Sequence, residues 1–250
     1  MNKKISIVIP YYNKINWIDQ TLKSIFDQTY KNYEILIIYD DTLKKDLKYL
    51  KKKINNKKIK LIINSKNLGA GPSRNKAVNF AKGEYIAFLD ADDIWKPNKL
   101  KLQLAFMEKF NLKISHTSYF IIDKNNKKIG SRIAKNKQTY KDLLNSCDIG
   151  LSLVVIEKKL FLRNKFTSNK TKEDYALWLK ISKKLPIYGF NKNLLLWRKT
   201  NNSLSSSISQ KLLDAFDIYY RKEKFNSFNS LYRVIILSIN YLFKKIKQSL

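Results

Sequence analysis

Three aspartates that follow a short apolar run have the types and spacing to hold a metal ion. Residues 85–89 are strand-forming, and Asp90, Asp92 and Asp93 come directly after them. Three carboxylates within four residues repel one another unless a cation lies between them. Oxygen ligands select a hard cation such as Mg²⁺ or Mn²⁺, which often bridges substrate phosphates. We therefore expect Asp90 and Asp92 to bind a metal, whereas Asp93 alone is expected in a solvated turn that caps the next helix.

Two further stretches carry polar groups that could act in a site. Residues 67–75 contain two glycines and a proline, and Ser73 is expected to cap the helix that follows. A glycine loop at a helix N-terminus can hold an anion, and Arg74 could add a contact to phosphate. The spacing matches neither the P-loop nor GxGxxG, so this loop alone favours an ordinary turn. Thr171 and Asp174 are spaced like a capping box, which is a purely structural interpretation.

The elements that must position these groups follow a strand–helix rhythm. Residues 5–9, 35–38 and 59–63 are near-continuous apolar runs, and helical patterns separate them. Strands that are apolar throughout are typical of a parallel sheet buried on both faces. Polar residues follow the strands, and in open α/β sheets ligands bind at the carboxyl ends of the strands. The pattern predicts an α/β fold with a mostly parallel, Rossmann-like sheet flanked by helices.

The second part of the chain follows a different pattern. Residues 98–110 form an amphipathic helical pattern, and residues 115–122 and 128–133 suggest a hairpin. The only histidine, His116, lies inside an expected strand, which favours a structural role. Cys147 is the only cysteine, so it can form no internal disulfide, and it is expected to be an inert small hydrophobe in a reducing compartment.

Composition limits the classes of function. The 250 residues have an apolar fraction of 44% and a formal charge of +30, and the N-terminal apolar run is too short for a signal-peptide core. Such a charge favours polyanionic partners. Only six of the fifty basic residues are arginine, the residue better suited to bidentate recognition of phosphates and bases. We interpret the charge mainly as a solvated surface with a bias toward anionic lipid, without nucleic acid as a partner.

The tail, residues 210–250, has a helical pattern that is too short and too polar to span a membrane. An aromatic and basic amphipathic helix can lie in an anionic interface. Packing on the domain or on a second subunit is an equally good interpretation. A Ser-rich stretch, residues 203–209, precedes the tail and is expected to be a loop that could order over a bound ligand.

Four motifs together resemble one family. Residues 6–13, Asp40-Asp41, residues 67–75 and residues 83–93 resemble, in order and spacing, the family 2 glycosyltransferases of the GT-A fold. The resemblance covers roughly the first hundred residues. It implies that the N-terminal half binds a nucleotide-diphospho-sugar, most often a UDP-sugar. It further implies a set of donor-binding residues: Pro10 and Tyr12 beside the base, Asp40 or secondly Asp41 reading the uracil, Arg74 on the nucleotide side, Asp90, and Arg198 near the diphosphate.

The same resemblance assigns the chemistry. Asp90 and Asp92 resemble the DxD motif of the family's Mn²⁺ or Mg²⁺ site, with Asp92 as the direct ligand. Asp174 matches the general base of inverting members, and Glu173 is the second choice. Such a base takes the proton of the acceptor hydroxyl as the oxygen attacks the sugar C1. Trp178, one helical turn further on, could stack on sugar or equally belong to the core.

The sequence thus predicts a metal-dependent, inverting glycosyltransferase. Residues 1–110 are expected to bind the nucleotide-sugar, residues 111–209 the acceptor, and residues 210–250 to form a helical basic tail. The expected acceptor is a lipid-linked glycan of surface polysaccharide, and the expected location is the cytoplasmic face of the cell membrane. The alternatives are a polyanion-binding protein without enzymatic activity, a sugar nucleotidyltransferase, which would call for a stronger Gly/Arg/Lys loop after the first strand, and an inactive or truncated transferase homologue.

Overall fold

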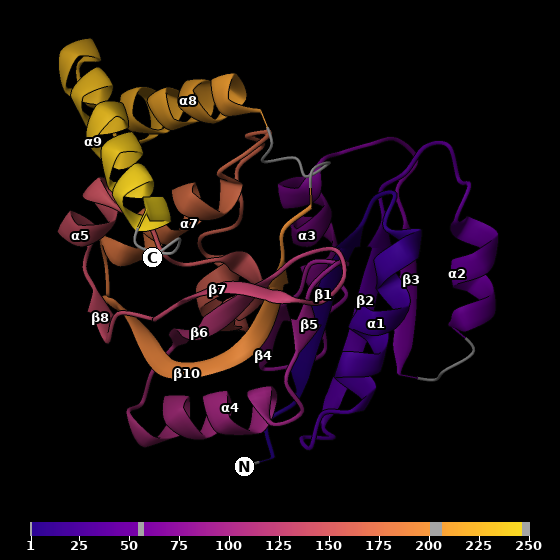
Figure 1. The fold of residues 1–250 in the computed structure, drawn as a ribbon. Coiled ribbons are helices and arrows are strands. Elements are labelled where there is room, and N and C mark those ends of the chain that lie inside the picture. Colours follow the sequence, from indigo (N-terminus) through magenta and orange to yellow (C-terminus); the bar gives the residue numbers. More distant parts are fainter. Residues whose placement is uncertain (1, 55–57, 201–206, 247–250) are drawn as a thin grey trace.

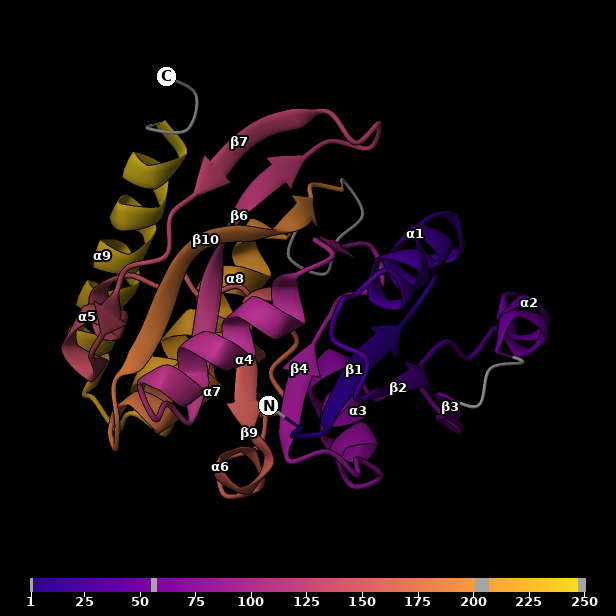
Figure 2. The ribbon, with the colours of Figure 1, turned by 90° about the horizontal axis from the view of Figure 1, so that it is seen from below.

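A computed structural model describes residues 2–54, 58–200 and 207–246 as a mixed α/β fold with helices on both faces of one sheet (Figures 1 and 2). The strands are β1 (Ile5–Tyr11), β2 (Tyr33–Tyr39), β3 (Ile59–Ile63), β4 (Tyr85–Phe88), β5 (Ile94–Trp95), β6 (Ile114–Ile122), β7 (Lys128–Arg132), β8 (Lys137–Gln138), β9 (Val155–Glu157) and β10 (Ile187–Arg198). The helices are α1 (Ile15–Phe26), α2 (Leu47–Lys53), α3 (Ala70–Val78), α4 (Lys99–Lys109), α5 (Tyr140–Asn145), α6 (Lys158–Leu162), α7 (Glu173–Ser182), α8 (Ile208–Asp217) and α9 (Ser227–Ile246), with a 3₁₀ turn η1 (Leu151–Leu153) and a π turn η3 (Ile218–Lys222).

The sheet joins both parts of the chain. Its order is β3-β2-β1-β4-β9-β6-β10-β5, with β7 on β6 and β8 on β10. Strands β1 to β4 are parallel, as the apolar runs predict, and β10 is parallel to β6. The short β9 is antiparallel to both β4 and β6 and connects the two parallel groups. Because one sheet crosses residue 110, the division there into donor and acceptor halves stays a prediction.

Alternating side chains of the central strands fill two cores. Ile7 and Ile9 face one core together with α1 and α4, whereas Val8 faces the other with α3, α6 and α7. This period of two, within strands buried on both faces, explains why the strands are apolar at nearly every position. The expected core Trp178 is fully buried, and its Nε1 donates to Ile149 O at 3.2 Å.

Strand β5, which directly follows residues 90–93, is held in the sheet by its pairing with β10. Trp95 and Ile94 pair with Leu195 and Leu196 of β10. Residues 90–93, named the aspartate loop here, therefore lie between β4 in the middle of the sheet and a strand anchored at its far end. The hairpin expected from residues 115–122 and 128–133 is confirmed as β6 and β7.

Three local expectations are wrong. Asp93 is not solvated but 1% exposed. Helix α3 begins at Ala70 after Gly69, whose φ of +82° favours glycine, so Ser73 is not its cap. Thr171 and Asp174 form no capping box: α7 follows Lys172, which has a left-handed φ of 59° and gives no side-chain cap.

The tail forms α8, η3 and α9, which lie together at the top left of Figure 1. Residues 203–206 of the Ser-rich stretch lie outside the described residues, and Ser207 caps α8 by accepting from Gln210 N. Across residues 2–54, 58–200 and 207–246, no helix is long and apolar enough to cross a membrane.

Candidate active site

The backbone of the aspartate loop is held from three sides. Asp90 N donates to Ser152 Oγ at 3.0 Å, and Thr21 Oγ1 donates to Asp93 O at 2.8 Å. Arg198 Nε donates to Asp92 O at 2.9 Å, and Arg198 N donates to Asp93 Oδ1 at 2.9 Å. Elements far apart in sequence thus fix where the carboxylates of Asp90 and Asp92 lie.

Two basic side chains form ion pairs with the carboxylates of Asp90 and Asp92. Lys14 Nζ lies 2.6 Å from Asp92 Oδ2, and Arg74 Nη2 lies 2.6 Å from Asp90 Oδ1. Burial raises the pKa of Asp92 even though Lys14 opposes the shift. Burial, and then repulsion by Asp92 and Asp90, raises the pKa of Asp93 well above its ordinary value. The loop is therefore a place where added positive charge is stabilising.

The carboxylate oxygens of Asp90 and Asp92 suit a hard divalent cation that takes its remaining ligands from phosphate and water. Asp90 Oδ2 has no hydrogen-bond partner among the described residues, and its side chain is 37% exposed. The described residues contain no cluster of three or more His, Cys, Asp or Glu able to hold a metal. A metal here would take one or two carboxylates from the protein and complete its shell with phosphate oxygens and water, as Mg²⁺ commonly does.

Arg74 connects the aspartate loop to the acid pair, Glu173 and Asp174. Its Nη1 lies 2.7 Å from Glu173 Oε1, while its Nη2 contacts Asp90. The Arg74 side chain is 4% exposed, and the two carboxylates raise its pKa against the effect of burial. Gly71 allows this approach, because a Cβ there would lie 2.7 Å from Thr167 O and 3.1 Å from Glu173 Cγ. The structure thus brings together three residues predicted from separate motifs.

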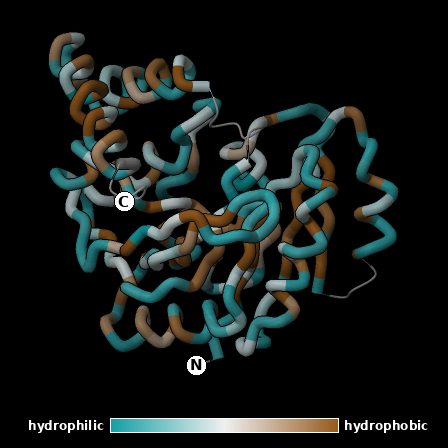
Figure 3. Tube along the Cα trace, viewed as in Figure 1, coloured by the Kyte–Doolittle hydropathy of each residue, from teal (hydrophilic) through white to brown (hydrophobic). Residues whose placement is uncertain are grey.

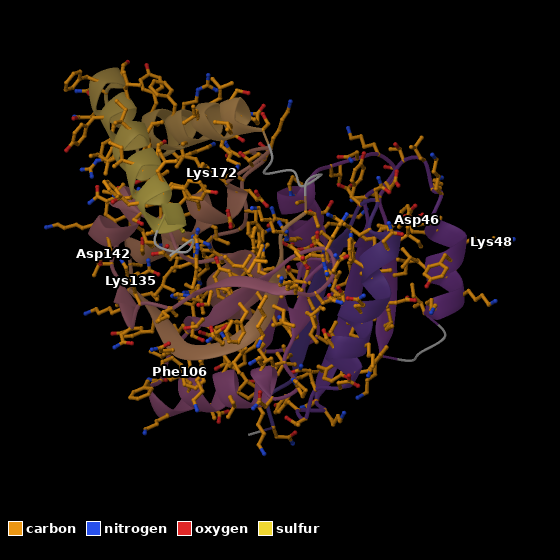
Figure 4. The ribbon with its side chains drawn as sticks, viewed as in Figure 1. Asp46, Lys48, Phe106, Lys135, Asp142 and Lys172 are labelled. Carbon is orange, nitrogen blue, oxygen red and sulfur yellow. The ribbon has the colours of Figure 1, made fainter. Side chains whose placement is uncertain are left out.

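Asp174 lies at the start of α7 with few partners. Its Oδ1 accepts from Tyr175 N at 2.7 Å, and no other hydrogen bond or ion pair reaches it among the described residues. Burial, followed by repulsion from Glu173, raises the pKa of Asp174 to about 7. The neighbouring Lys172 is labelled in Figure 4, where α7 begins beneath α8. A carboxylate with this pKa can both accept and release a proton near neutral pH.

The nucleotide-side residues lie at the ends of β1 and β2. Tyr12 is 48% exposed just beyond β1, and Pro10 is in register with Ile38 of β2. Tyr11 stacks on Tyr39 with ring centroids 5.3 Å apart and donates to Asp46, which Figure 4 labels at the start of α2. The stacked Tyr11 and Tyr39 are thus buried at the carboxyl ends of β1 and β2, and the exposed Tyr12 directly follows Tyr11.

Asp40 and Asp41 have different surroundings. Asp40 accepts from Leu68 N and Gly69 N at 2.8 and 2.9 Å and from Asn64 Nδ2 at 2.7 Å, so both of its oxygens are used within the protein. Asp41 Oδ1 accepts only from Leu43 N, and its Oδ2 has no partner among the described residues. Asp40 therefore shapes the glycine loop, whereas Asp41 has an oxygen available to a ligand.

Sequence reasoning expected Arg198 near the donor diphosphate, and its guanidinium binds protein groups. Besides Asp92 O, its Nη1 donates to Asp123 O at 3.2 Å and its Nη2 donates to Gln20 Oε1 at 2.8 Å. The guanidinium carbon lies 4.2 Å from the ring centroid of Trp17. Arg198 thus holds the aspartate loop in position.

Lys14 belongs to the candidate site through its contact with Asp92, and the sequence analysis did not predict it. It follows the polar end of β1, and Asn13 before it has a left-handed φ of 47°. Its position just after β1 is a usable signal, since Asp41 and Asp92 also follow the carboxyl ends of strands. His116, in contrast, is fully buried in β6, and burial lowers its pKa to about 4, in keeping with a structural residue.

The sheet and its flanking helices have the arrangement of the GT-A fold. A model of "Glycosyl transferase family 2" matches residues 6–168, and the chain belongs to this family. It is therefore a glycosyltransferase. Asp174 lies just beyond the matched residues.

Comparisons with individual proteins agree with this family. The chain is 36% identical, over 86% of its length and 84% of the relative's, to the Escherichia coli UDP-Glc:alpha-D-GlcNAc-diphosphoundecaprenol beta-1,3-glucosyltransferase WfgD. It is 39% identical over 76% of its length to an uncharacterized glycosyltransferase, RC0461, of Rickettsia conorii, of which it spans only 32%.

Two solved structures share the fold. Staphylococcus aureus TarS 1-349 in complex with UDP-GlcNAc matches 91% of this chain and 69% of that one, with a TM-score of 0.66 at 20% identity. The mannosyltransferase PcManGT from Pyrobaculum calidifontis, in complex with GDP-Man and Mn²⁺, matches 94% of this chain and 70% of that one, with a TM-score of 0.68 at 12% identity.

Proposed function

We propose that this glycosyltransferase moves a sugar from a UDP-sugar to a hydroxyl of a glycan linked to a lipid diphosphate, with inversion at the sugar C1. The observation that carries the proposal is the chain of contacts Asp90–Arg74–Glu173, which links the aspartate loop to the residue next to Asp174. The UDP-sugar and the lipid-linked acceptor are supported by the name of WfgD, which is 36% identical to this chain over 217 residues. This acceptor suits surface polysaccharide synthesis on the cytoplasmic face of the cell membrane.

The donor lies across the carboxyl ends of β1, β2 and β4 in this proposal. Tyr12 lies against the uracil. Asp41, whose Oδ2 has no partner among the described residues, accepts from the uracil, while Asp40 orders the glycine loop. The diphosphate faces Asp90 and Asp92. A bound Mn²⁺ or Mg²⁺ there would supply Lewis-acid neutralisation of the departing diphosphate. Lys14 and Arg74 add fixed positive charge at the same place.

Asp174 acts on the acceptor. The carboxylate takes the proton of the attacking hydroxyl, the oxygen forms its bond to C1, and the bond from C1 to the UDP oxygen breaks in the same displacement. UDP leaves with the electron pair of that bond. Attack from the face opposite the leaving group converts an α-linked donor into a β-linked product.

Family membership favours this function over polyanion binding and nucleotidyl transfer. The test is a thermal-shift panel of UDP-sugars and other nucleotide-sugars, with and without Mn²⁺, followed by transfer to a lipid-diphosphate-linked GlcNAc. We expect one UDP-sugar to stabilise the protein, and more so with Mn²⁺. Stabilisation by no nucleotide-sugar, or transfer that is unaffected by chelation of divalent ions, would contradict the proposal.

A further inference from the structure

The last helix of the described structure, α9, has two faces of different character. Its inner face packs on the protein: Val234 and Leu237 are buried, Arg233 Nη1 donates to Asn145 Oδ1 at 2.7 Å, and Asn240 Nδ2 donates to Asn145 O at 3.0 Å. Lys244 forms an ion pair with Asp148 at 2.5 Å. These contacts fix the orientation of the helix, so the composition of its other face is a property of the folded protein.

The outer face is apolar along the whole helix. Figure 3 shows brown segments recurring along α8 and α9 at the upper left. On α9 the exposed large side chains recur at steps of three or four residues, which places them on one side of the helix. This outer stripe comprises Phe228 (79% exposed), Leu231 (54%), Ile235 (48%), Ile239 (42%), Leu242 (56%) and Phe243 (64%). An apolar stripe of this length on the surface marks a binding surface.

The charges around the stripe indicate what binds it. Residues 207–246 contain seven Lys and Arg against three Asp and Glu. Asp214 accepts from Thr171 and Glu223 pairs with Lys183. Asp217 accepts from Asn169 and also pairs with Arg221 at 3.3 Å, so it offsets only one of the cations before α9. Arg221, Lys222 and Lys224, just before α9, are exposed. A second copy of this chain would bring like charges together, whereas an anionic bilayer offers both apolar depth and opposite charge.

We propose that the outer stripe of α9 is a docking surface for an anionic lipid bilayer. The stripe lies in the acyl and headgroup boundary, and the cations before α9 lie at the lipid phosphates. The fold connects this surface to the active site, because Asp214 of α8 accepts from both Thr171 N and Thr171 Oγ1 at 2.7 Å, and Thr171 is three residues before Asp174. Docking by this face brings the proposed general base to a membrane that holds the acceptor. The inference rests on the proposed function only for the nature of that acceptor.

The first experiment is flotation of the full chain with vesicles of phosphatidylcholine, alone or mixed with phosphatidylglycerol. The stripe variant is Leu231→Gln/Ile235→Gln/Ile239→Gln. The matched control is Leu43→Gln/Phe110→Gln/Ile133→Gln, whose side chains are 69%, 55% and 67% exposed on other elements. We expect wild type and control to float with mixed vesicles and the stripe variant to bind more than about tenfold more weakly.

A second pair of variants separates local charge from the general charge of +30. Arg221→Gln/Lys222→Gln/Lys224→Gln removes the cations beside the stripe, and Lys48→Gln/Lys51→Gln/Lys52→Gln removes the same charge from α2, on the other side of the molecule (Figures 1 and 4). We expect a several-fold loss of vesicle binding for the first and little change for the second. Equal losses for the two would overturn the proposal, since any basic protein would then behave alike.

An environment-sensitive label tests insertion without disabling the surface. In a Cys147→Ser background, a fluorophore at Ile235→Cys should shift to the blue on mixed vesicles, whereas one at Ile133→Cys should not. No shift at position 235, or flotation of the stripe variant equal to wild type, overturns the proposal. So does a wild-type dimer that the stripe variant converts to a monomer, because a second copy would then cover the face.

Nucleotide-sugar binding, measured by thermal shift on the same variants, keeps the two proposals separate. Stripe variants that bind the donor normally but not vesicles support the docking surface. A protein that docks on vesicles yet binds no nucleotide-sugar would contradict the proposed function and leave the docking surface intact.

Discussion

The aspartate loop and the acid pair consist of the same kind of side chain and differ in how they are compensated. Asp90 and Asp92 each contact a basic side chain at 2.6 Å, and Arg198 holds the loop backbone. In the acid pair, Glu173 takes the contact with Arg74, and Asp174 forms no ion pair with any of the described residues. Burial and Glu173 accordingly raise the pKa of Asp174 to about 7. The environment thus gives Asp90 and Asp92 each a basic partner at contact distance, whereas the raised pKa of Asp174 suits the proton exchange that we propose for it.

Removing a charge from the aspartate loop should have the largest effect. Asp92→Asn keeps the shape of the side chain and removes the charge that faces the diphosphate, so turnover should fall by at least about 10³-fold. The stability of the fold should change little, because burial of this charge is unfavourable. Turnover with a UDP-sugar and Mn²⁺ is the measurement. Asp27→Asn, at an exposed pair with Lys23, is the control, and wild-type turnover by Asp92→Asn would refute the assignment.

Removing the proposed base should cost less and should spare the donor. Asp174→Asn is expected to lower kcat by about 10²- to 10³-fold, the range for loss of a general base, with the Kd for UDP unchanged in calorimetry. Glu173→Gln should weaken the contact with Arg74 and produce a smaller loss. A loss of UDP affinity in Asp174→Asn would instead make Asp174 a donor ligand, and equal kcat would exclude it as the base.

The pH dependence should report Asp174. Its pKa of about 7 predicts that kcat/KM rises about tenfold per pH unit below 7 and levels off above it, because only the carboxylate accepts a proton.

The free energy of unfolding should depend on pH in the opposite direction. A folded pKa above the unfolded value favours folding at low pH, and this contribution is lost as pH rises toward 7. Asp174→Asn should remove both dependences. A rate profile that is flat between pH 5 and 8 would contradict this assignment.

Removing Lys14 should give the smallest and most diagnostic change. Because Lys14 neutralises Asp92, Lys14→Met should tighten binding of Mn²⁺ to the free enzyme several-fold and weaken binding of UDP without metal. Electron paramagnetic resonance of Mn²⁺ measures the first, and calorimetry measures the second. Lys23→Met, which loses an exposed pair with Asp27, is the control and should change neither. Weaker Mn²⁺ binding in Lys14→Met would show that the contact with Asp92 does not compete with metal.

The apolar runs in the sequence correctly predicted the first three strands of the sheet. The runs at residues 5–9, 35–38 and 59–63 lie in β1, β2 and β3, because strands buried on both faces leave a continuous apolar signal. The helix expected at residues 98–110 is α4, Lys99–Lys109. For the tail, packing on the domain is confirmed for one face of α9, which contacts α5 and the body. The other face is exposed, and its binding to a membrane stays a prediction.

Contacts between distant residues account for what the sequence did not reveal. Asp93 is buried because its carboxylate accepts from Arg198 N, 105 residues further on. Thr171 forms no capping box because its hydroxyl donates to Asp214, 43 residues further on. The pair between Lys14 and Asp92 spans 78 residues. Spacing along the chain carries no information on such pairs. The roles of Asp40, Asp41 and Arg198 depend equally on partners that only the fold reveals.

The buried guanidinium of Arg74 contacts both the aspartate loop, where we propose that the donor binds, and the acid pair, where we propose that the acceptor reacts. Arg74 divides its positive charge between Asp90 and Glu173, so a ligand that draws Asp90 away leaves more of that charge for Glu173. Glu173 then repels Asp174 less, and the proton affinity of Asp174 falls. By thermodynamic reciprocity, the protonation of Asp174 must in turn alter how tightly the ligand at Asp90 is held. Under the proposed function, this chain of three side chains couples donor binding at Asp90 to the protonation state of Asp174.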